Sequence, residues 1–186
     1  MTMDSGNWIS LAGLILAAGG AVTAYLRSRE NQLRRMDVLH WAIACISLLR
    51  SVQVRLASNS DDASLDEAAV IDAQADLSAL IDHGRLFFRN VNPGSGRPQD
   101  HGLEKNPAYQ GLRPMILDPL VAVFDGLELV RGPFATRRNE IASAVDCATR
   151  DFVSLAQSEV GRSRAASKIA SEAGYGAPID RYLRRM

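Results

Sequence analysis

The chain has 186 residues, and its 21 basic and 21 acidic side chains leave a formal net charge of zero. A balanced charge produces no global field that would attract nucleic acid, so composition gives no signal for such a partner. The two cysteines, Cys45 and Cys147, stand in apolar helical patterns and not in a CxxC motif. This usage argues against a disulfide framework and a zinc site, and we expect no metal and no cofactor.

The first predicted element is a membrane span. The stretch from Trp8 to Leu26 contains no charged residue and is about as long as a helix must be to cross roughly 30 Å of hydrocarbon. Four arginines crowd its distal end: Arg27, Arg29, Arg34 and Arg35. Only Asp4 is charged before it. The positive-inside rule then predicts residues 1–27 as the anchor of a single-pass membrane protein, with the N-terminus outside and the C-terminal domain in the cytoplasm.

Two alternatives remain for this stretch. A cleaved signal peptide would need a small-residue site, which Val22 and Ala24 offer, but also a positive region before the apolar run, which is missing. A buried core helix is the second alternative, suggested by Gly13, Gly19 and Gly20. Glycine is common in membrane spans, however, and we favour the span.

Helical periodicity continues beyond the anchor. From residue 27 to residue 56 apolar side chains recur at three and four positions, which predicts one long helix: Leu33, Met36, Leu39, Ile43, Ile46, Leu49, Val52 and Leu56. Turn-forming residues then run from Ser58 to Ser64, and a capping-box spacing starts a second helix at Leu65. The stripe of this helix runs from Val70 to Gly84 and includes Leu80. We expect the two helices to form an antiparallel hairpin.

Two further helices are predicted after an irregular segment at 85–114. Asp118 has the character of an N-cap before a third helix, which covers Pro119–Val130. A fourth begins near Thr136 and loses its apolar face after Val160.

The remaining residues, 173–186, form a basic tail that either packs locally through Tyr175, Ile179 and Tyr182 or waits for a partner. The sum is an all-α protein: an N-terminal transmembrane helix followed by an antiparallel cytoplasmic four-helix bundle, with the bundle domain at 28–172.

The irregular segment carries two motifs. They are GRLFFRN from Gly84 to Asn90 and YQGLRPMILDPLV from Tyr109 to Val121. Together they resemble a pattern of uncharacterised small bacterial single-span membrane proteins, in which GRxFFxN precedes YxGxRPxxLDPLV. The resemblance implies a bacterial source and a helical cytoplasmic domain, but no mechanism.

The same segment supplies the candidate binding residues, Arg85, Arg89, Tyr109 and Arg113. A mixture of arginine and aromatic side chains suits the binding of phosphate, carboxylate or a stacked base. The alternative is that these residues are structural staples, with the arginines paired to acids such as Asp118. We favour this alternative, because a loop of this length needs internal contacts.

The most economical function is a membrane-anchored helical binding protein, a scaffold or a sensor/effector subunit without its own catalysis, whose partners are the lipid bilayer and a protein or a second copy. A rival is a HEPN-like ribonuclease or another nucleotide or nucleic-acid hydrolase, suggested by the spacing of Arg35 and His40. A third possibility is a membrane-perturbing defence or toxin effector. His83 and His101 stand in no motif that binds metal.

Overall fold

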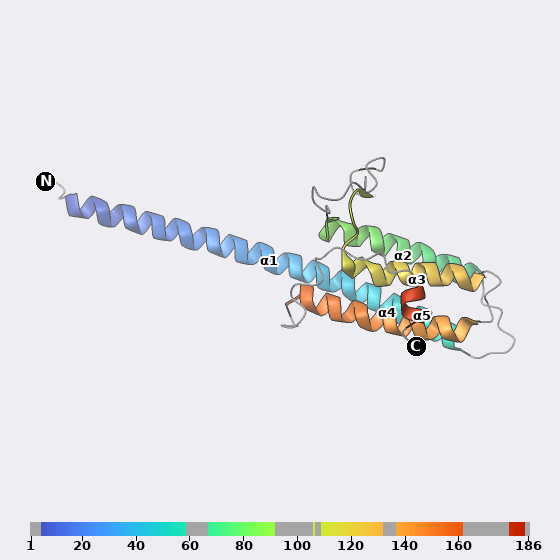
Figure 1. Ribbon diagram of the computed structural model, residues 1–186. Coiled ribbons are helices and arrows are strands. Elements are labelled where there is room, and N and C mark those ends of the chain that lie inside the picture. The colour runs from blue at the N-terminus through green and yellow to red at the C-terminus, as the bar shows by residue number, and fades with distance from the viewer. Residues whose placement is uncertain are drawn as a thin grey trace. The chain divides into compact units, whose positions relative to one another are not determined.

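The computed structural model describes residues 5–58, 67–91, 106, 109–131, 137–161 and 179–184, with side chains from residue 16 onward except those of residues 180 and 181. In these ranges every regular element is helical (Figure 1). The elements are α1 (Ser5–Ala57), α2 (Glu67–Phe87), a 3₁₀ turn η2 (Met115–Leu117), α3 (Asp118–Arg131), α4 (Arg138–Glu159) and α5 (Ile179–Leu183). The all-α class and the long apolar N-terminal helix are therefore confirmed.

The chain divides into two compact units, residues 1–37 and residues 38–186, and α1 contributes to both. In the described part of the first unit, large apolar side chains are exposed, among them Leu16, Val22 and Leu26. By length and composition, α1 is a helix that could cross a membrane. The predicted domain limits at residues 27 and 172 stay predictions.

The second unit has one hydrophobic core, to which all five α-helices contribute. The buried stripe of α1 consists of Val38, Trp41, Ala42, Cys45, Leu49, Val52 and Leu56. The predicted stripe was wrong at Leu33, Met36 and Ile43, which are exposed, whereas Ile46 packs against the core. Trp41 and Cys45, which were not in the predicted stripe, are buried. Apolar residues recur at helical spacing on both faces of α1, so periodicity alone could not select the face that packs.

Trp41 lies near the centre of this core. Its ring centre is 5.5 Å from those of Phe88 and Phe152, and its indole Nε1 donates a hydrogen bond of 2.8 Å to the carbonyl oxygen of Leu80. The close approach of Trp41 to α2 depends on Gly84, because a Cβ there would lie 2.7 Å from Trp41 Cζ2. Trp41 therefore joins α1 to α2 and α4.

Polar side chains link the helices at their edges. Between α1 and α4, Arg50 binds Asp146 at 2.6 Å, and Arg138 Nε donates to the carbonyl oxygen of Leu56 near the end of α1. Between α2 and α3, Gln74 Nε2 donates to Glu128 at 3.0 Å. Such groups satisfy hydrogen-bonding needs at the core boundary.

Several helix limits differ from the predictions. Helix α2 continues to Phe87, three residues into the segment predicted to be irregular, because Phe87 and the next residue, Phe88, pack toward Trp41. Asp118 is not an N-cap: its backbone is helical (φ −59°, ψ −43°) and η2 leads directly into α3. The predicted turn at 58–64 and the predicted start at Leu65 lie almost entirely outside the described residues.

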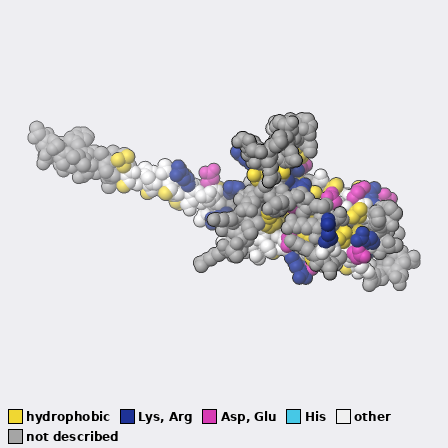
Figure 2. Space-filling view, in the orientation of Figure 1, with side chains coloured by type: hydrophobic (Ala, Val, Ile, Leu, Met, Phe, Trp, Pro, Cys, Tyr) yellow, Lys and Arg dark blue, Asp and Glu magenta, His cyan; other side chains and the backbone are white. Residues whose placement is uncertain are grey.

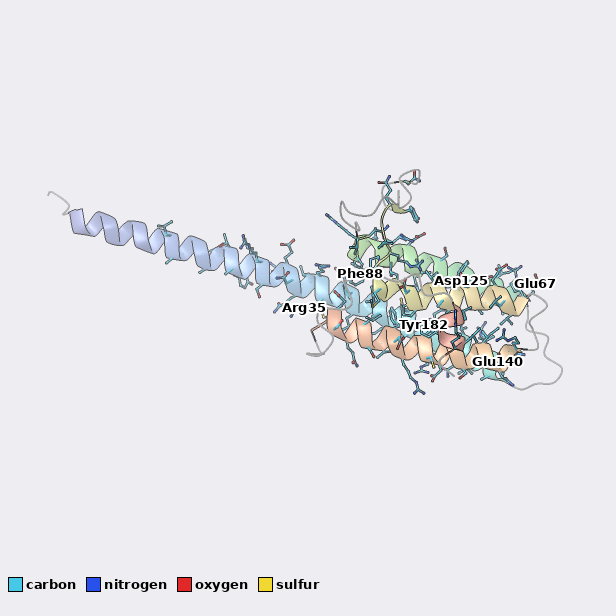
Figure 3. The ribbon with its side chains drawn as sticks, in the orientation of Figure 1. Arg35, Glu67, Phe88, Asp125, Glu140 and Tyr182 are labelled. Atoms are coloured by element: carbon cyan, nitrogen blue, oxygen red, sulfur yellow. The ribbon has the colours of Figure 1, made fainter. Side chains whose placement is uncertain are left out.

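The C-terminal segment packs on the core. Helix α5 contacts α3 and α4, and both Ile179 and Tyr182 are buried (Figure 3, where Tyr182 is labelled). Of the two alternatives for the tail, local packing therefore holds for these two residues, which form an apolar face one helical turn apart. Tyr175 lies outside the described part of the chain.

Candidate functional site

The two motifs of the irregular segment meet in space. The residue after GRLFFRN, Val91, forms an isolated antiparallel bridge with Leu112, with N–O distances of 2.7 and 2.8 Å. Next to it, Asn90 Nδ2 donates to the carbonyl oxygen of Gln110 at 2.8 Å. Gly111 permits this approach, because its φ of +85° is unfavourable for other residues and a Cβ would lie 3.0 Å from the carbonyl oxygen of Val91.

Arg85 and Tyr109 form one contact across this junction. The guanidinium carbon of Arg85 lies 4.5 Å from the centre of the Tyr109 ring, within the range of a cation–π interaction. Asp82, one turn earlier on α2, accepts a hydrogen bond of 3.2 Å from the Tyr109 hydroxyl and lies 3.4 Å from Arg85 Nε. Arg85 and Asp82 therefore hold the Tyr109 side chain against the end of α2.

Arg113, unlike Arg85, forms an ion pair with an acid at the start of α3. Its Nε donates to Asp118 Oδ1 at 2.9 Å, which ties the segment before η2 to the first residue of α3. The side chain of Asp118 is 3% exposed, and its second oxygen, Oδ2, accepts no hydrogen bond from the described residues. The guanidinium of Arg113 is thus the main compensation for a buried carboxylate.

Asp125, two turns further along α3, is partly buried (labelled in Figure 3). Burial raises the pKa of its carboxyl group, and the positive charge of Arg113 partly offsets this rise. Arg113 therefore acts on two acids of α3, on Asp118 through a hydrogen bond and on Asp125 through its charge.

Arg89 is the exception among the four candidates. It is exposed, and no described residue forms a hydrogen bond or ion pair with it. Leu86, one turn earlier, is 79% exposed. The structure thus gives Arg85, Tyr109 and Arg113 partners within the chain, and leaves Arg89 and Leu86 facing solvent at the end of α2.

The contacts explain most of the motif positions physically. Gly84 admits Trp41, Phe88 packs on Trp41, Asn90 supports the bridge, and Arg113 holds the start of α3. This arrangement can position a surface. As a scaffold it agrees with the staple alternative for Arg85, Tyr109 and Arg113.

Other candidates from the sequence lie elsewhere. Arg35 belongs to the first unit and His40 to the second, and both are exposed. His83 is exposed and its ring centre is 5.3 Å from that of Phe87, while His101 lies outside the described residues. Where the structure describes side chains, no three His, Cys, Asp or Glu residues gather as metal ligands.

Cys45 lies in the core of the second unit. Burial raises the pKa of its thiol to about 12, so the thiolate that nucleophilic chemistry requires is not formed near neutral pH. A buried cysteine of this kind behaves as a small apolar side chain.

Sequence reasoning placed Gly84 in an apolar stripe and in a motif, but gave neither Gly84 nor Asp82 a role at the junction. The signal for Asp82 was its position three residues before Arg85, a spacing at which opposite charges on a helix meet. The signal for Gly84 was a glycine inside an apolar helical stripe, which indicates close packing.

No family model matches the chain, and no curated protein or solved structure is significantly similar to it.

Proposed function

We propose that the chain is a membrane-anchored helical binding protein, a scaffold or a sensor/effector subunit without its own catalysis. The observation that carries this proposal is the exposure of apolar side chains in the first unit. There, Leu16, Val22 and Leu26 are exposed along an uncharged stretch of α1. Apolar side chains exposed in series along a helix favour lipid as their surroundings. The same helix supplies the core stripe of the second unit from Val38 onward.

The anchor would place the protein in a bacterial inner membrane. Arginines follow the apolar stretch and Asp4 precedes it, which supports an outer N-terminus and a cytoplasmic second unit.

The cytoplasmic unit would be an antiparallel four-helix bundle of α1 to α4. In support, α2 packs on α3 and α3 on α4, while Trp41 and Arg50 join α1 to its neighbours. The connections from α1 to α2 and from α3 to α4 are short, which favours antiparallel neighbours.

The contact surface would lie at the end of α2. Arg89 and Leu86 supply the solvent-facing groups, and Arg85, Tyr109 and Arg113 hold the backbone beneath them. An exposed apolar side chain beside an exposed guanidinium suits a protein partner or a second copy with an acidic, apolar patch.

The anchor is tested by fractionation and by a reporter. The full-length chain should resist carbonate extraction, and a reporter fused after Met186 should be active in the cytoplasm. A shortened soluble product would show that the segment is a cleaved signal, and an active reporter outside the cytoplasm would overturn the orientation.

The contact surface is tested by a matched pair of variants in membranes of the native host. Arg89→Ala should abolish cross-linking to the partner and leave the melting temperature unchanged, because exposed substitutions usually cost less than about 0.5 kcal/mol. Arg113→Ala should lower the melting temperature. If Arg89→Ala retains full cross-linking to the partner, this surface is not the binding site.

A further inference from the structure

The segment of α1 that follows the apolar stretch is rich in exposed arginine. We propose that Arg27, Arg29 and Arg35 bind the phosphate groups of anionic phospholipids at the cytoplasmic face of the bilayer. This inference rests on the proposed function, since it assumes that residues before Arg27 occupy the membrane.

Exposure and charge support the site. The side chains of all three arginines are exposed, and Figure 2 shows basic side chains on this part of the first unit. Only two acids lie among residues 27–37, Glu30 and Asp37. Arg34 already takes part in an interaction within the chain, so the site does not depend on it.

Helix geometry places the arginines at suitable depths. Because a helix rises about 1.5 Å per residue, Arg27 and Arg29 lie within about 5 Å of the end of the apolar stretch. This distance is about the thickness of the headgroup layer. Arg35 lies about 13 Å beyond Leu26. Side chains on a helix lean toward its N-terminus, and here the N-terminus lies in the direction of the bilayer. The long side chain of Arg35 therefore extends back toward the lipid phosphates.

An exposed aromatic residue marks the depth independently. Tyr25 is 66% exposed and stands two residues before Arg27. Tyrosine is enriched at the level of the headgroups, where its ring is apolar and its hydroxyl is wet. Its position therefore agrees with a membrane surface at the start of the arginine segment.

The chemistry favours anionic lipid over zwitterionic lipid. A guanidinium can bind a phosphate through two parallel hydrogen bonds. In phosphatidylcholine the phosphate is neutralised by the lipid's own ammonium group, whereas in phosphatidylglycerol it is not. The attraction to an anionic surface rises with each basic residue near it.

The experiment compares lipid binding by the full-length chain reconstituted in vesicles. Spin-labelled phosphatidylglycerol and phosphatidylcholine report the relative affinity of each lipid for the protein. The variant Arg27→Gln/Arg29→Gln/Arg35→Gln should lose about tenfold in its preference for phosphatidylglycerol. Replacing the same three arginines by lysine should restore most of the preference, because the charges return.

A matched control replaces two exposed arginines of the second unit, Arg55 and Arg184, by glutamine, and should keep the parental preference. Carbonate extraction of each vesicle sample tests insertion separately. A parent that is inserted but shows no preference for phosphatidylglycerol overturns the lipid site and leaves the anchor intact. A parent that is extracted overturns the anchor itself. A lysine variant no better than the glutamine variant also overturns the site.

Discussion

Arg113 compensates a carboxylate that water scarcely reaches. Its Nε donates to Asp118 Oδ1, while Asp118 Oδ2 has no described partner and the side chain of Asp118 is 3% exposed. Losing the guanidinium would leave a buried charge without compensation, which costs more than the pair itself contributes.

Arg113→Ala should therefore lower the free energy of unfolding by about 2 kcal/mol, less than for a fully buried pair because Arg113 is itself 25% exposed. Urea unfolding of the full-length chain in detergent measures it. The double change Arg113→Ala/Asp118→Asn should recover part of the loss, since the uncompensated charge is gone. Equal stability of Arg113→Ala and the parent would contradict the assigned role.

Gly84 offers a second prediction at the scale of one residue. A methyl group there would lie 2.6 Å from Leu117 Cδ2 and 2.7 Å from the rigid ring of Trp41, all of them buried. Overpacking should outweigh the better helix propensity of alanine, so Gly84→Ala should cost about 1 to 2 kcal/mol of unfolding free energy.

The matched control for Gly84→Ala is Gly126→Ala in α3. Its nearest atom would be Ile179 Cδ1 at 3.3 Å, the end of a side chain that can move slightly. Thermal melting should show a clearly smaller change for this control. A parental melting temperature for Gly84→Ala would mean that Trp41 does not pack against α2 as described.

The sequence predicted the candidate residues of the junction better than their partners. Each arginine meets an acid that is close in the sequence, Asp82 for Arg85 and Asp118 for Arg113. The place of Tyr109, by contrast, depends on how α2 and the segment before α3 come together. Asp82 binds Tyr109 across 27 positions, and no local pattern specifies such a contact.

At the scale of elements, α1 and α4 are linked by one acid between two arginines. The hydrogen bond from Arg50 lowers the pKa of the Asp146 carboxyl group, Arg150 adds to this effect, and burial acts in the opposite direction. Because the pKa of Asp146 is lower in the folded state, its carboxylate stabilises the fold at pH values above the usual aspartate pKa of about 4. This stabilisation is lost as the pH falls through the lowered folded-state pKa.

Asp146→Asn should lower stability near neutral pH by about 1 kcal/mol, because both arginines are largely exposed. Below the usual aspartate pKa, variant and parent should converge. Urea midpoints measured across the acidic range test this, with the exposed Asp72→Asn as the control. A stability difference that stays constant down to the lowest pH would argue against the ion pair.

Helix α5 has five residues, too few to be stable alone. Burial of two large side chains contributes about 1.5 to 3 kcal/mol each, while ordering each residue costs about 1 kcal/mol. Docking is thus nearly balanced. Tyr182→Ala should release α5, seen as rapid hydrogen exchange at residues 179–184, with little change in the melting of α3 and α4. Arg184→Ala, at an exposed position, should keep the protection, and persistent protection in Tyr182→Ala would show that Tyr182 does not hold α5.

The lengths of the elements followed from periodicity, but the packing face of α1 did not. Leu33, Met36 and Ile43 are exposed although they recur at helical spacing, because this helix carries a second apolar face opposite its core stripe. The spacing of apolar residues does not specify which of the two faces packs against the other helices. The short α5 was equally invisible, since two apolar residues do not define a period.

At the scale of the whole molecule, the division after Asp37 separates the exposed apolar helix from the packed unit. The core stripe begins at Val38, so the side chains before it are not needed to complete that core. If the first residues of α1 span a membrane, their deletion should leave the packed unit intact. If they belong to a core helix, their deletion should destabilise that unit.

A fragment from Arg27 to Met186 should be soluble without detergent, should keep the helical content of the second unit, and should melt within a few degrees of the same unit in the full-length chain. The physical reason is that the deleted residues would lose contact with lipid only, whereas loss of a core helix exposes apolar surface worth about 25 cal/mol per Å². Circular dichroism and sedimentation measure the outcome, with the full-length chain in detergent for comparison. A fragment that aggregates or melts much earlier would show that residues before Arg27 pack on the protein rather than in a membrane, and the anchor would have to be abandoned.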